Sequence, residues 1–452
     1  MQSEQRGTRI LILGGGFAGV NSALALQHEL RGTDAKVAIV NRENFFVFYP
    51  LLPEIISGAI ETEHVLNPIR LIVPNARLYV GDVVGIDLPH GQVEIRHGLY
   101  QHQQTPRTLY YDHLVLALGG VPSTSRIPGL AAYAFDVQRL SNAFALRNHV
   151  IDTLEQAVIE RDQVARERLL TYVIIGGGPT GIEVAAEIAG LLDDALRYYA
   201  DVERSEARVI VLEYAPRILM PVQEKLAEAA TRNLERRGVE IRCDTGVARI
   251  ERGSVILNSG ESIQSETVVG SVGVDPNPLI CDLPVPHDER GRLTASDTLT
   301  VGDYRNVWAI GDLARVYDPH TGKPYPATAQ HAVREAKTVA HNIAASIRGK
   351  PLKTMTYKTK GQLVALGKRN AIAEIGPFTA TGFLAWWLWR SYYLTQMPLP
   401  NKRLRVLFSW TIDLFSPPTL VQLKVGQPAP MATHNSVVEV APGDAESEPT
   451  TS

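Results

Sequence analysis

Residues 9–19, RILILGGGFAG, are the stretch that decides the fold of this chain. The apolar run 10–13 ends in the pattern Gly14-x-Gly16-x-x-Gly19, and apolar residues at helical spacing follow over 20–30. This order predicts a strand, a tight turn and a helix whose N-terminus favours an anion. The first glycine permits the turn, the second lets a pyrophosphate approach the backbone, and the third lets helix and strand pack closely. Alone, the pattern is weak, because a glycine turn that binds nothing can also show it.

A second copy of this pattern lies later in the chain. An apolar strand over 170–175 ends in Gly176-x-Gly178-x-x-Gly181, and a helix over 182–192 and a strand over 208–212 follow. Two independent units of this kind predict two bound dinucleotides.

The residue after the second strand of each unit indicates which nucleotide is bound. Glu213 ends the strand 208–212, where a carboxylate accepts hydrogen bonds from the adenosine ribose of NADH and repels the 2′-phosphate of NADPH. Arg217 could neutralise that phosphate, but the pattern favours NADH. In the first unit Asn41 takes the place of the acid, and an amide still bonds a ribose hydroxyl, though less strongly.

Composition limits the classes of function. At 452 residues the chain is too long for one core, which predicts two or three domains, and a net charge of −3 argues against a nucleic-acid partner. The two cysteines, Cys243 and Cys281, form no CxxC pair, so we expect a reducing compartment and no metal site. Cys243 is expected inside a strand as a small buried residue. No apolar run approaches the ~20 residues of a membrane-spanning helix, and the N-terminus does not resemble a targeting sequence.

The remaining elements complete the expected pattern. The stretches 77–118 and 239–275 read as β-structure, 126–170 as mostly helical, and 330–347 as a helix. A strand over 307–310 ends in Gly311-Asp312, and an acid at that position suits either a ligand or a simple turn.

Taken together, these motifs resemble the two-dinucleotide flavoproteins, and more specifically the type II NADH dehydrogenases, single-chain NADH:quinone oxidoreductases. The resemblance covers roughly residues 8–425 and is carried by ILGGGFAG, YDHLVLALGG, GGGPTGIE, NVWAIGD and TAQHA. It implies FAD on the first fold and NADH on the second. Residues 41–60 contain no cysteine, which argues against the related disulfide reductases and sulfide:quinone oxidoreductases.

The resemblance also implies individual site residues. Those expected at FAD are Gly14, Gly16, Phe17, Ala18, Gly19, Asn41, Arg42, Val83, Gly119, Asp312 and Ala329. Those expected at NADH are Gly176, Gly178, Pro179, Thr180, Gly181, Glu213 and Gly273.

Two further residues are expected to be catalytic. Gln330 would lie at the flavin ring, and Glu183 would lie near the nicotinamide and relay protons to the quinone. Glu335 and His331 are alternative relays, and Glu183 could instead be an acid stabilised by the helix dipole. Arg334 stands where family members often have Gln, a departure in the expected quinone pocket.

The C-terminal part is rich in aromatic residues. Four of the five tryptophans lie in residues 386–410, and Lys402, Arg403 and Arg405 interrupt the apolar run. This composition predicts that residues 383–415 lie on an anionic membrane surface, with a dimer interface or a cap on the core as the alternatives. The tail 427–452 is predicted to be disordered.

The sequence therefore predicts an α/β protein with two Rossmann-like dinucleotide-binding domains, the NADH domain inserted in the FAD domain, and an amphipathic membrane-docking C-terminal region. The expected ranges are 6–168 and 287–350 for the FAD domain, 169–286 for the NADH domain, and 351–426 for membrane association or dimerisation. The expected function is a non-proton-pumping NADH:quinone oxidoreductase, peripheral on the cytoplasmic side of the cell membrane and capable of forming a homodimer. The alternatives are a reductase of a soluble acceptor of the ferredoxin or rubredoxin type, and a nicotinamide-sensing flavoprotein.

Overall fold

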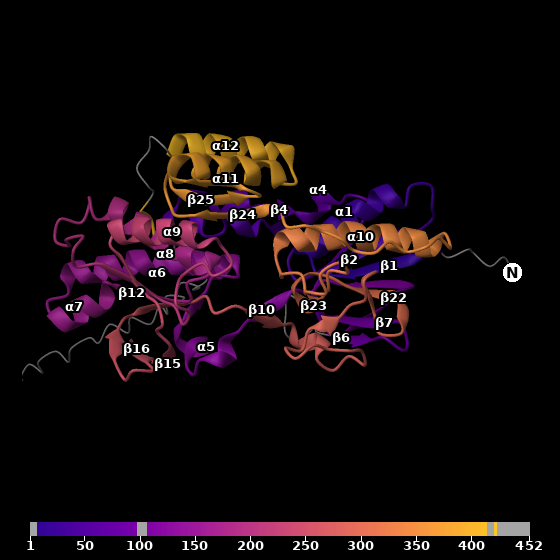
Figure 1. Ribbon diagram of the computed structural model, residues 1–452, viewed down its shortest axis with the longest axis horizontal. Coiled ribbons are helices and arrows are strands. Elements are labelled where there is room, and N and C mark those ends of the chain that lie inside the picture. Colours follow the sequence, from indigo (N-terminus) through magenta and orange to yellow (C-terminus); the bar gives the residue numbers. More distant parts are fainter. Residues whose placement is uncertain (1–6, 97–105, 414–419, 423–452) are drawn as a thin grey trace, which may run out of the picture.

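The computed structural model describes residues 7–96, 106–413 and 420–422. Two mainly parallel β-sheets, each with helices packed against it, lie side by side, and a smaller C-terminal unit covers them at the top of the view (Figure 1). The predicted disordered tail and the end of the predicted membrane stretch lie outside the described residues.

The first sheet has six strands, and its centre is the strand with which the sequence analysis began. In spatial order the strands are β21 (Thr300–Val301), β22 (Tyr304–Ala309), β9 (His113–Leu116), β1 (Arg9–Leu13), β2 (Lys36–Asn41) and β5 (Arg77–Val80). Strand β1 pairs in parallel with both β2 and β9. Its residues Ile10, Leu11, Ile12 and Leu13 are at most 3% exposed, as a strand covered on both faces requires.

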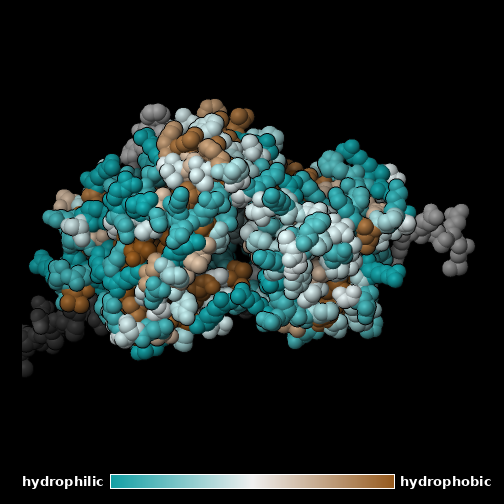
Figure 2. All heavy atoms as spheres, viewed as in Figure 1, coloured by the Kyte–Doolittle hydropathy of each residue, from teal (hydrophilic) through white to brown (hydrophobic). Residues whose placement is uncertain are grey.

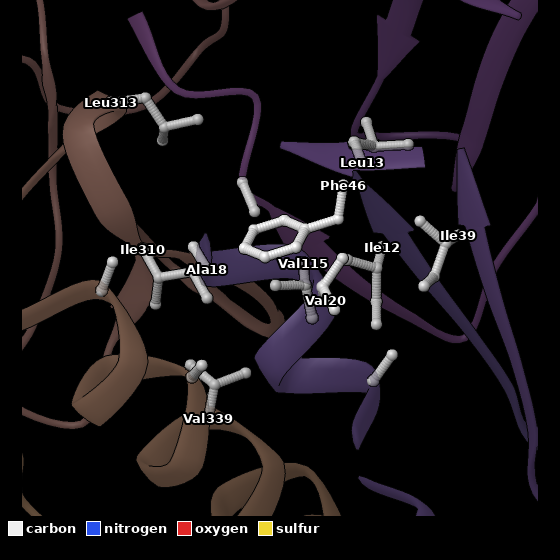
Figure 3. Close-up of a cluster of buried hydrophobic side chains, with 14 of the residues drawn as sticks. Ile12, Leu13, Ala18, Val20, Ile39, Phe46, Val115, Ile310, Leu313 and Val339 are labelled. Carbon is white, nitrogen blue, oxygen red and sulfur yellow. The ribbon is translucent and has the colours of Figure 1, made fainter. Parts of the chain in front are cut away.

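Two helices from opposite ends of the sequence cover this sheet. Helices α1 (Phe17–Glu29) and α10 (Ala329–Ile347) lie next to each other above β1 and β2 (Figure 1). Figure 3 shows how Ile12, Val20 and Val339 meet in the layer between them, together with Phe46 from β3 (Phe45–Val47). The core thus fixes the start of α1 against the end of β1.

The second sheet repeats the first. Its five strands, in spatial order, are β11 (Phe135–Asp136), β18 (Thr267–Gly270), β12 (Thr171–Ile175), β13 (Arg208–Leu212) and β14 (Val239–Arg242). The order β18-β12-β13-β14 matches the order β9-β1-β2-β5 of the first sheet. Helix α8 (Pro179–Ala195) follows β12 as α1 follows β1, and most of its residues are buried.

The chain passes between the two sheets twice, at strands that pair with each other. Strand β10 (Gly120–Pro122) runs antiparallel to β19 (Val274–Pro276), and β10 lies between the two sheets in Figure 1. Helices α6 (Leu140–Ile159) and α7 (Gln163–Leu169) contribute to the core of the second unit, as β11 does to its sheet. We therefore propose that the boundaries lie at β10 and β19, which moves residues 123–168 out of the range 6–168 that was predicted for the FAD domain.

Smaller elements complete the chain. The remaining short helices and turns are Tyr49–Leu51, α2 (Glu54–Ser57), α3 (Thr62–Val65), α4 (Ile69–Ile72), Thr124–Arg126, α5 (Leu130–Tyr133), α9 (Glu224–Arg236), Pro278–Ile280 and Gly311–Leu313. The remaining strands are β4 (Leu66–Pro68), β6 (Asp82–Asp87), β7 (Gln92–Arg96), β8 (Arg107–Tyr110), β15 (Val247–Glu251), β16 (Ser254–Leu257), β17 (Ser262–Gln264), β20 (Leu293–Thr294) and β23 (Ala314–Arg315).

The two cysteines are free. Cys243 was expected to be buried inside a strand, and that prediction was wrong: it follows the last residue of β14 and is only partly buried. Cys243 continues the alternation of Val239 and Ile241 and packs against the second core, but lies at its margin, beyond the end of the strand. Cys281 is exposed.

The C-terminal unit consists of the strands β24 (Gly361–Ala365), β25 (Ala371–Ile375) and β26 (Phe378–Thr381) and the helices α11 (Gly382–Gln396) and α12 (Pro400–Asp413). In the part of the chain that the structure describes, no helix is long and apolar enough to span a bilayer.

A buried ion pair attaches these two helices to the first unit. Arg390 of α11 donates to Glu54 of α2 at 3.3 Å, and the indole nitrogen of Trp410 in α12 donates to the other oxygen of Glu54 at 2.8 Å. The guanidinium group lies 4.3 Å from the ring centre of Trp386 and 4.4 Å from that of Trp410. Since Glu54 and Arg390 are 4% and 7% exposed, the two opposite charges compensate each other away from water.

We predict that Arg390→Leu destabilises the protein by about 3 kcal/mol, because it leaves the buried Glu54 carboxylate without its cation. The fall in the thermal midpoint, followed by circular dichroism, measures the effect. The exposed Arg405 of α12 provides the control, since Arg405→Leu removes an equal charge from the surface. Equal midpoints for the two variants would contradict the role given to the pair.

Candidate functional site

The first glycine loop has the geometry of a pyrophosphate cradle. Gly14 has φ = +107°, and a Cβ there would lie 2.2 Å from the carbonyl oxygen of Ala117. A Cβ on Gly19 would lie 1.9 Å from the oxygen of Gly14, so only glycine lets α1 pack this closely on β1. A Cβ on Gly16 would meet nothing within 4 Å. Gly16 therefore faces open space at the N-terminus of α1, where an anion is stabilised.

The second glycine loop has nearly the same φ angle and the same close contacts as the first. Gly176 has φ = +109°, and a Cβ there would lie 2.3 Å from the oxygen of Ser271. A Cβ on Gly181 would lie 1.9 Å from the oxygen of Gly176, and one on Gly178 would meet nothing within 4 Å. The exposed side chains of Pro179 and Thr180 begin α8 beside this space. Both loops thus fit a dinucleotide in the same way.

Two further glycines, one in each unit, border unfilled space at equivalent positions. Gly119 follows β9 and Gly273 follows β18, with φ of +65° and +95°. A Cβ on either would meet no atom within 4 Å. Because they follow strands that flank β1 and β12, both border the edge at which the loops open, as expected for residues beside a bound nucleotide.

The central amide of each loop is held by a side chain at the carboxyl end of the second strand of its unit. The amide of Gly15 donates to Asn41 Oδ1 at 2.8 Å, and that of Gly177 donates to Glu213 Oε2 at 2.5 Å. Asn41 and Glu213 thus fix the loop in addition to any contact with a ribose. Asn41 also donates from Nδ2 to the carbonyl of Glu43 at 2.8 Å, which a carboxylate cannot do. The amide at position 41 therefore suits its local backbone better than an acid would.

Arg217 does not offer a free charge to a 2′-phosphate. Its guanidinium group donates to the carbonyl oxygens of Ile218, Leu219, Met220 and Val222 at 2.9–3.2 Å. Glu213 accepts a second backbone bond, from Ala215 at 2.7 Å, and its carboxylate retains further acceptor capacity. This arrangement favours NADH over NADPH.

The other residues expected at FAD surround the first loop. Phe17 packs edge-on against Phe46, with ring centres 5.0 Å apart, and the buried Ala18 lies against Gly311. Val83 is partly buried in β6, and Arg42 forms an exposed ion pair with Asp82 at 2.6 Å. Burial raises the pKa of the Asp312 carboxyl.

The start of α10 is tied to β24. Gln330, next to Ala329, donates from Nε2 to the carbonyl of Gly361 at 3.0 Å and accepts from the Tyr357 hydroxyl at 3.2 Å. Arg334, the departure from the family pattern, places its guanidinium group 5.2 Å from the ring centre of Tyr357. Gln330 and Arg334 thus share Tyr357 as a neighbour.

Of the alternative proton carriers, His331 is the least suitable. It is 1% exposed, lies between the rings of Tyr325 and Tyr357, and bonds Thr328 at 2.8 Å. Burial lowers its pKa, so it is a neutral core residue at pH 7. Glu335 accepts from the amide of Gly311 at 2.7 Å, and burial raises the pKa of its carboxyl to about 7.

Glu183 contacts the other end of β24. It accepts from the amide of Ala365 at 3.1 Å and keeps part of its surface exposed. Desolvation raises the pKa of its carboxyl to about 8, and the charges of Glu187 and Glu54 act in the same direction. The two residues expected to be catalytic, Glu183 and Gln330, therefore contact opposite ends of one strand.

Sequence reasoning missed three polar residues behind this site. Glu54 closes the aromatic run FFVFYPLLPE, Ser57 follows it in α2, and Glu187 lies on α8. The spacing of Glu183 and Glu187 was the available signal, since residues four apart share one face of a helix. The buried partner of Glu54, in contrast, is 336 positions away and no local pattern indicates it.

The open space at the second loop can be tested with two glycines of one turn. Gly178→Ala should leave the thermal midpoint unchanged and raise the KM for NADH by about tenfold or more, since a methyl group would occupy the space opposite the pyrophosphate. Gly181→Ala should destabilise the fold by ~2 kcal/mol or more, because its Cβ overlaps a backbone oxygen. Unchanged NADH kinetics in Gly178→Ala would show that the nucleotide does not bind there.

Comparison with known proteins agrees with this geometry. The sequence matches the family described as pyridine nucleotide-disulphide oxidoreductase over residues 8–336. The type II NADH:quinone oxidoreductase Ndh of Mycobacterium tuberculosis is 31% identical over 423 residues, which cover 90% of this chain and 88% of that protein. The demethylphylloquinone reductase NdbB of Synechocystis is 30% identical over 409 residues, covering 89% of this chain and 95% of that protein.

Solved structures share the fold. The structure of NDH2 from Plasmodium falciparum in complex with NADH superposes with a TM-score of 0.83 at 17% identity, covering 92% of this chain and 100% of that one. Together, the match over 8–336 and the curated relatives show that this chain belongs to the pyridine nucleotide-disulphide oxidoreductase family, and within it to the type II NADH dehydrogenases.

Proposed function

We propose that this chain oxidises NADH and reduces a membrane quinone as a peripheral membrane flavoprotein, with FAD at the first loop and NADH at the second. The observation that carries the proposal is the pair of matched glycine loops beside a C-terminal helix pair with an exposed apolar face. FAD supplies the chemistry that accepts a hydride from NADH and passes on two electrons. The chain itself binds and orients the cofactors, excludes water and handles protons.

The exposed apolar face is formed by α11 and α12, and we call it the apolar face below. Figure 2 shows hydrophobic residues gathered at the top of the molecule, above these helices. Its members, each 46–66% exposed, are Phe383, Leu384, Trp387, Leu404, Leu407, Phe408 and Ile412. The exposed Arg405 lies among them, which suits an anionic bilayer. A patch of this kind on a helix pair is typical of a protein that lies in the membrane interface.

The buried side of α11 packs against aromatic residues next to the first glycine loop. Tyr393 of α11 packs against Phe48, with ring centres 6.2 Å apart, and Phe48 in turn packs against Phe17 at 5.8 Å. Burial raises the pKa of the Tyr393 hydroxyl, and the charge of Glu183 adds to the effect. A quinone dissolved in the bilayer would therefore have a short path from the apolar face to Glu183 and Gln330.

The roles of the site residues follow from their surroundings. Glu183 holds a proton at neutral pH because its pKa is raised to about 8, so it can donate that proton to a reduced quinone. Gln330, held by Gly361 and Tyr357, would orient the quinone and flavin at the start of α10. The proposal places the enzyme on the cytoplasmic side of the membrane, where NADH is produced.

A steady-state assay of the purified protein tests the function. We expect NADH to be oxidised in preference to NADPH, with a short-chain quinone as an efficient acceptor and ferredoxin as a poor one. The extracted cofactor should be FAD. A preference for ferredoxin, or a turnover too slow to exceed the decay of a stable NADH complex, would contradict the proposal and favour the two alternatives raised by the sequence.

The membrane assignment needs point substitutions, because deleting α11 and α12 would also remove buried residues such as Trp386, Trp389 and Arg390. The triple variant Trp387→Ser, Leu404→Ser, Phe408→Ser changes exposed side chains only. We predict that it loses flotation with anionic liposomes by tenfold or more, since each side chain contributes roughly 1 kcal/mol or more of apolar burial.

The matched control is Ile159→Ser, Val164→Ser, Tyr214→Ser, which removes three side chains that are 67–81% exposed elsewhere. The control should float like the native protein. If the first variant floats equally well and instead converts a dimer to a monomer in lipid-free solution, the apolar face is a homodimer interface and the membrane assignment is wrong.

A further inference from the structure

We propose that Ser57 and Glu187 form a proton path from solvent to Glu183, so that Glu187 recharges Glu183 after each turnover. This inference rests on the proposed quinone reductase function and on the role given to Glu183 in it. Glu187 does not touch the reacting groups in this scheme and is a relay residue behind the site.

The stoichiometry of the reaction requires such a supply. NADH delivers two electrons and one proton as a hydride, whereas a quinone takes up two electrons and two protons when it becomes a quinol. One proton per turnover must therefore come from water. Glu183 carries a single proton, so it must take up another before it can act again.

Helix α8 places the donor directly behind Glu183. Glu187 lies one helical turn further along on the same face. It is 5% exposed, so it cannot exchange protons with bulk water by itself. Its Oε2 accepts a hydrogen bond from the hydroxyl of Ser57, at the end of α2.

Ser57 connects this buried carboxyl to the surface. Ser57, Gly58 and Ala59 are all partly exposed, whereas the residues on either side of this segment are buried. A hydroxyl both donates and accepts, so Ser57 can give its proton to Glu187 and take one from water. Each transfer breaks one O–H bond and forms another, and no charge accumulates on Ser57.

Burial keeps the Glu187 carboxyl partly protonated near neutral pH. Desolvation raises the pKa of its carboxyl to about 7, and the charge of Glu54 adds to this, while Ser57 and the cations Arg237 and Arg390 oppose it. Glu183 on the same helix has the higher value, about 8. The pKa values of the two neighbouring carboxyls are thus both raised toward neutral pH, so either group can hold the proton that passes between them.

The neighbouring cations bind other groups and do not neutralise Glu187. Arg237 is held by the carbonyl oxygens of Leu366 and Ala186, and Arg390 is held by Glu54. No ion pair between Glu187 and a cation is found within the described residues. Glu187 thus has a hydroxyl partner and a mobile proton instead of a fixed counter-ion.

The test compares two acceptors in Glu187→Gln. Ferricyanide takes electrons and no proton, so its reduction should stay within about twofold of the native rate. Quinone turnover should fall by about tenfold or more, as when a proton-transfer group is removed. The solvent deuterium isotope effect on quinone turnover should rise, and Glu187→Asp should restore part of the rate.

A second pair of variants avoids the buried position. Ser57→Ala removes the relay hydroxyl and Ser57→Thr keeps it, so only the alanine variant should slow quinone turnover and enlarge the isotope effect. Because the charge of Glu187 raises the pKa of Glu183, Glu187→Gln should also shift the alkaline fall of quinone turnover to lower pH.

The outcomes separate this inference from the function on which it depends. If the native protein reduces no quinone with NADH, the proposed function itself fails. If Glu183→Gln abolishes quinone turnover while Glu187→Gln and Ser57→Ala retain it, the relay is overturned and the role of Glu183 stands. Equal losses with both acceptors would show that Glu187 is structural, which also overturns the relay.

Discussion

The close approach of a helix to the strand before it is the constraint on which both nucleotide sites depend. Gly19 and Gly181 touch the carbonyl oxygens of Gly14 and Gly176 at a distance that no Cβ allows. This contact aims the N-termini of α1 and α8 across the carboxyl ends of their sheets. The dipole of each helix and the free amides of its first turn then face the same open space. In each unit, the hydrophobic core beneath the sheet stabilises this arrangement of strand, glycine loop and helix.

The parts of the fold that sequence could predict are those set by neighbouring residues. After their first residues, Arg9 and Thr171, the strands β1 and β12 are apolar because both faces of the sheet are covered, and glycine follows each run. The helices α1, α8, α10 and α11 follow from apolar spacing in the same way. Local patterns could not reveal that β11 joins the second sheet, because a strand of two residues has no periodicity. They also could not place Glu54 against Arg390, since that contact is made only when the whole chain has folded.

Asn41 and Glu213 show why a motif position can be filled by a different residue. In both units the side chain must accept from the central amide of the loop, and an amide oxygen does this as well as a carboxylate. The second oxygen of Glu213 accepts from Ala215, whereas the corresponding nitrogen of Asn41 donates to Glu43. The backbone after the strand offers the carbonyl of Glu43 to Asn41 in the first unit and the amide of Ala215 to Glu213 in the second. The residue type is therefore set by the turn after the strand as well as by the ribose.

The ion pair between Glu54 and Arg390 holds the C-terminal helices at a high desolvation cost. Apolar side chains of similar volume would hold α11 and α12 on α2 at least as well, since burying two charges costs several kcal/mol before they attract each other. The pair does bring two opposite charges close to the buried acids of α8. The Glu54 carboxylate raises the pKa of both Glu187 and Glu183, and Arg390 limits that effect at Glu187. The contact that attaches the apolar face to the protein thus also sets the protonation of the acids behind the site.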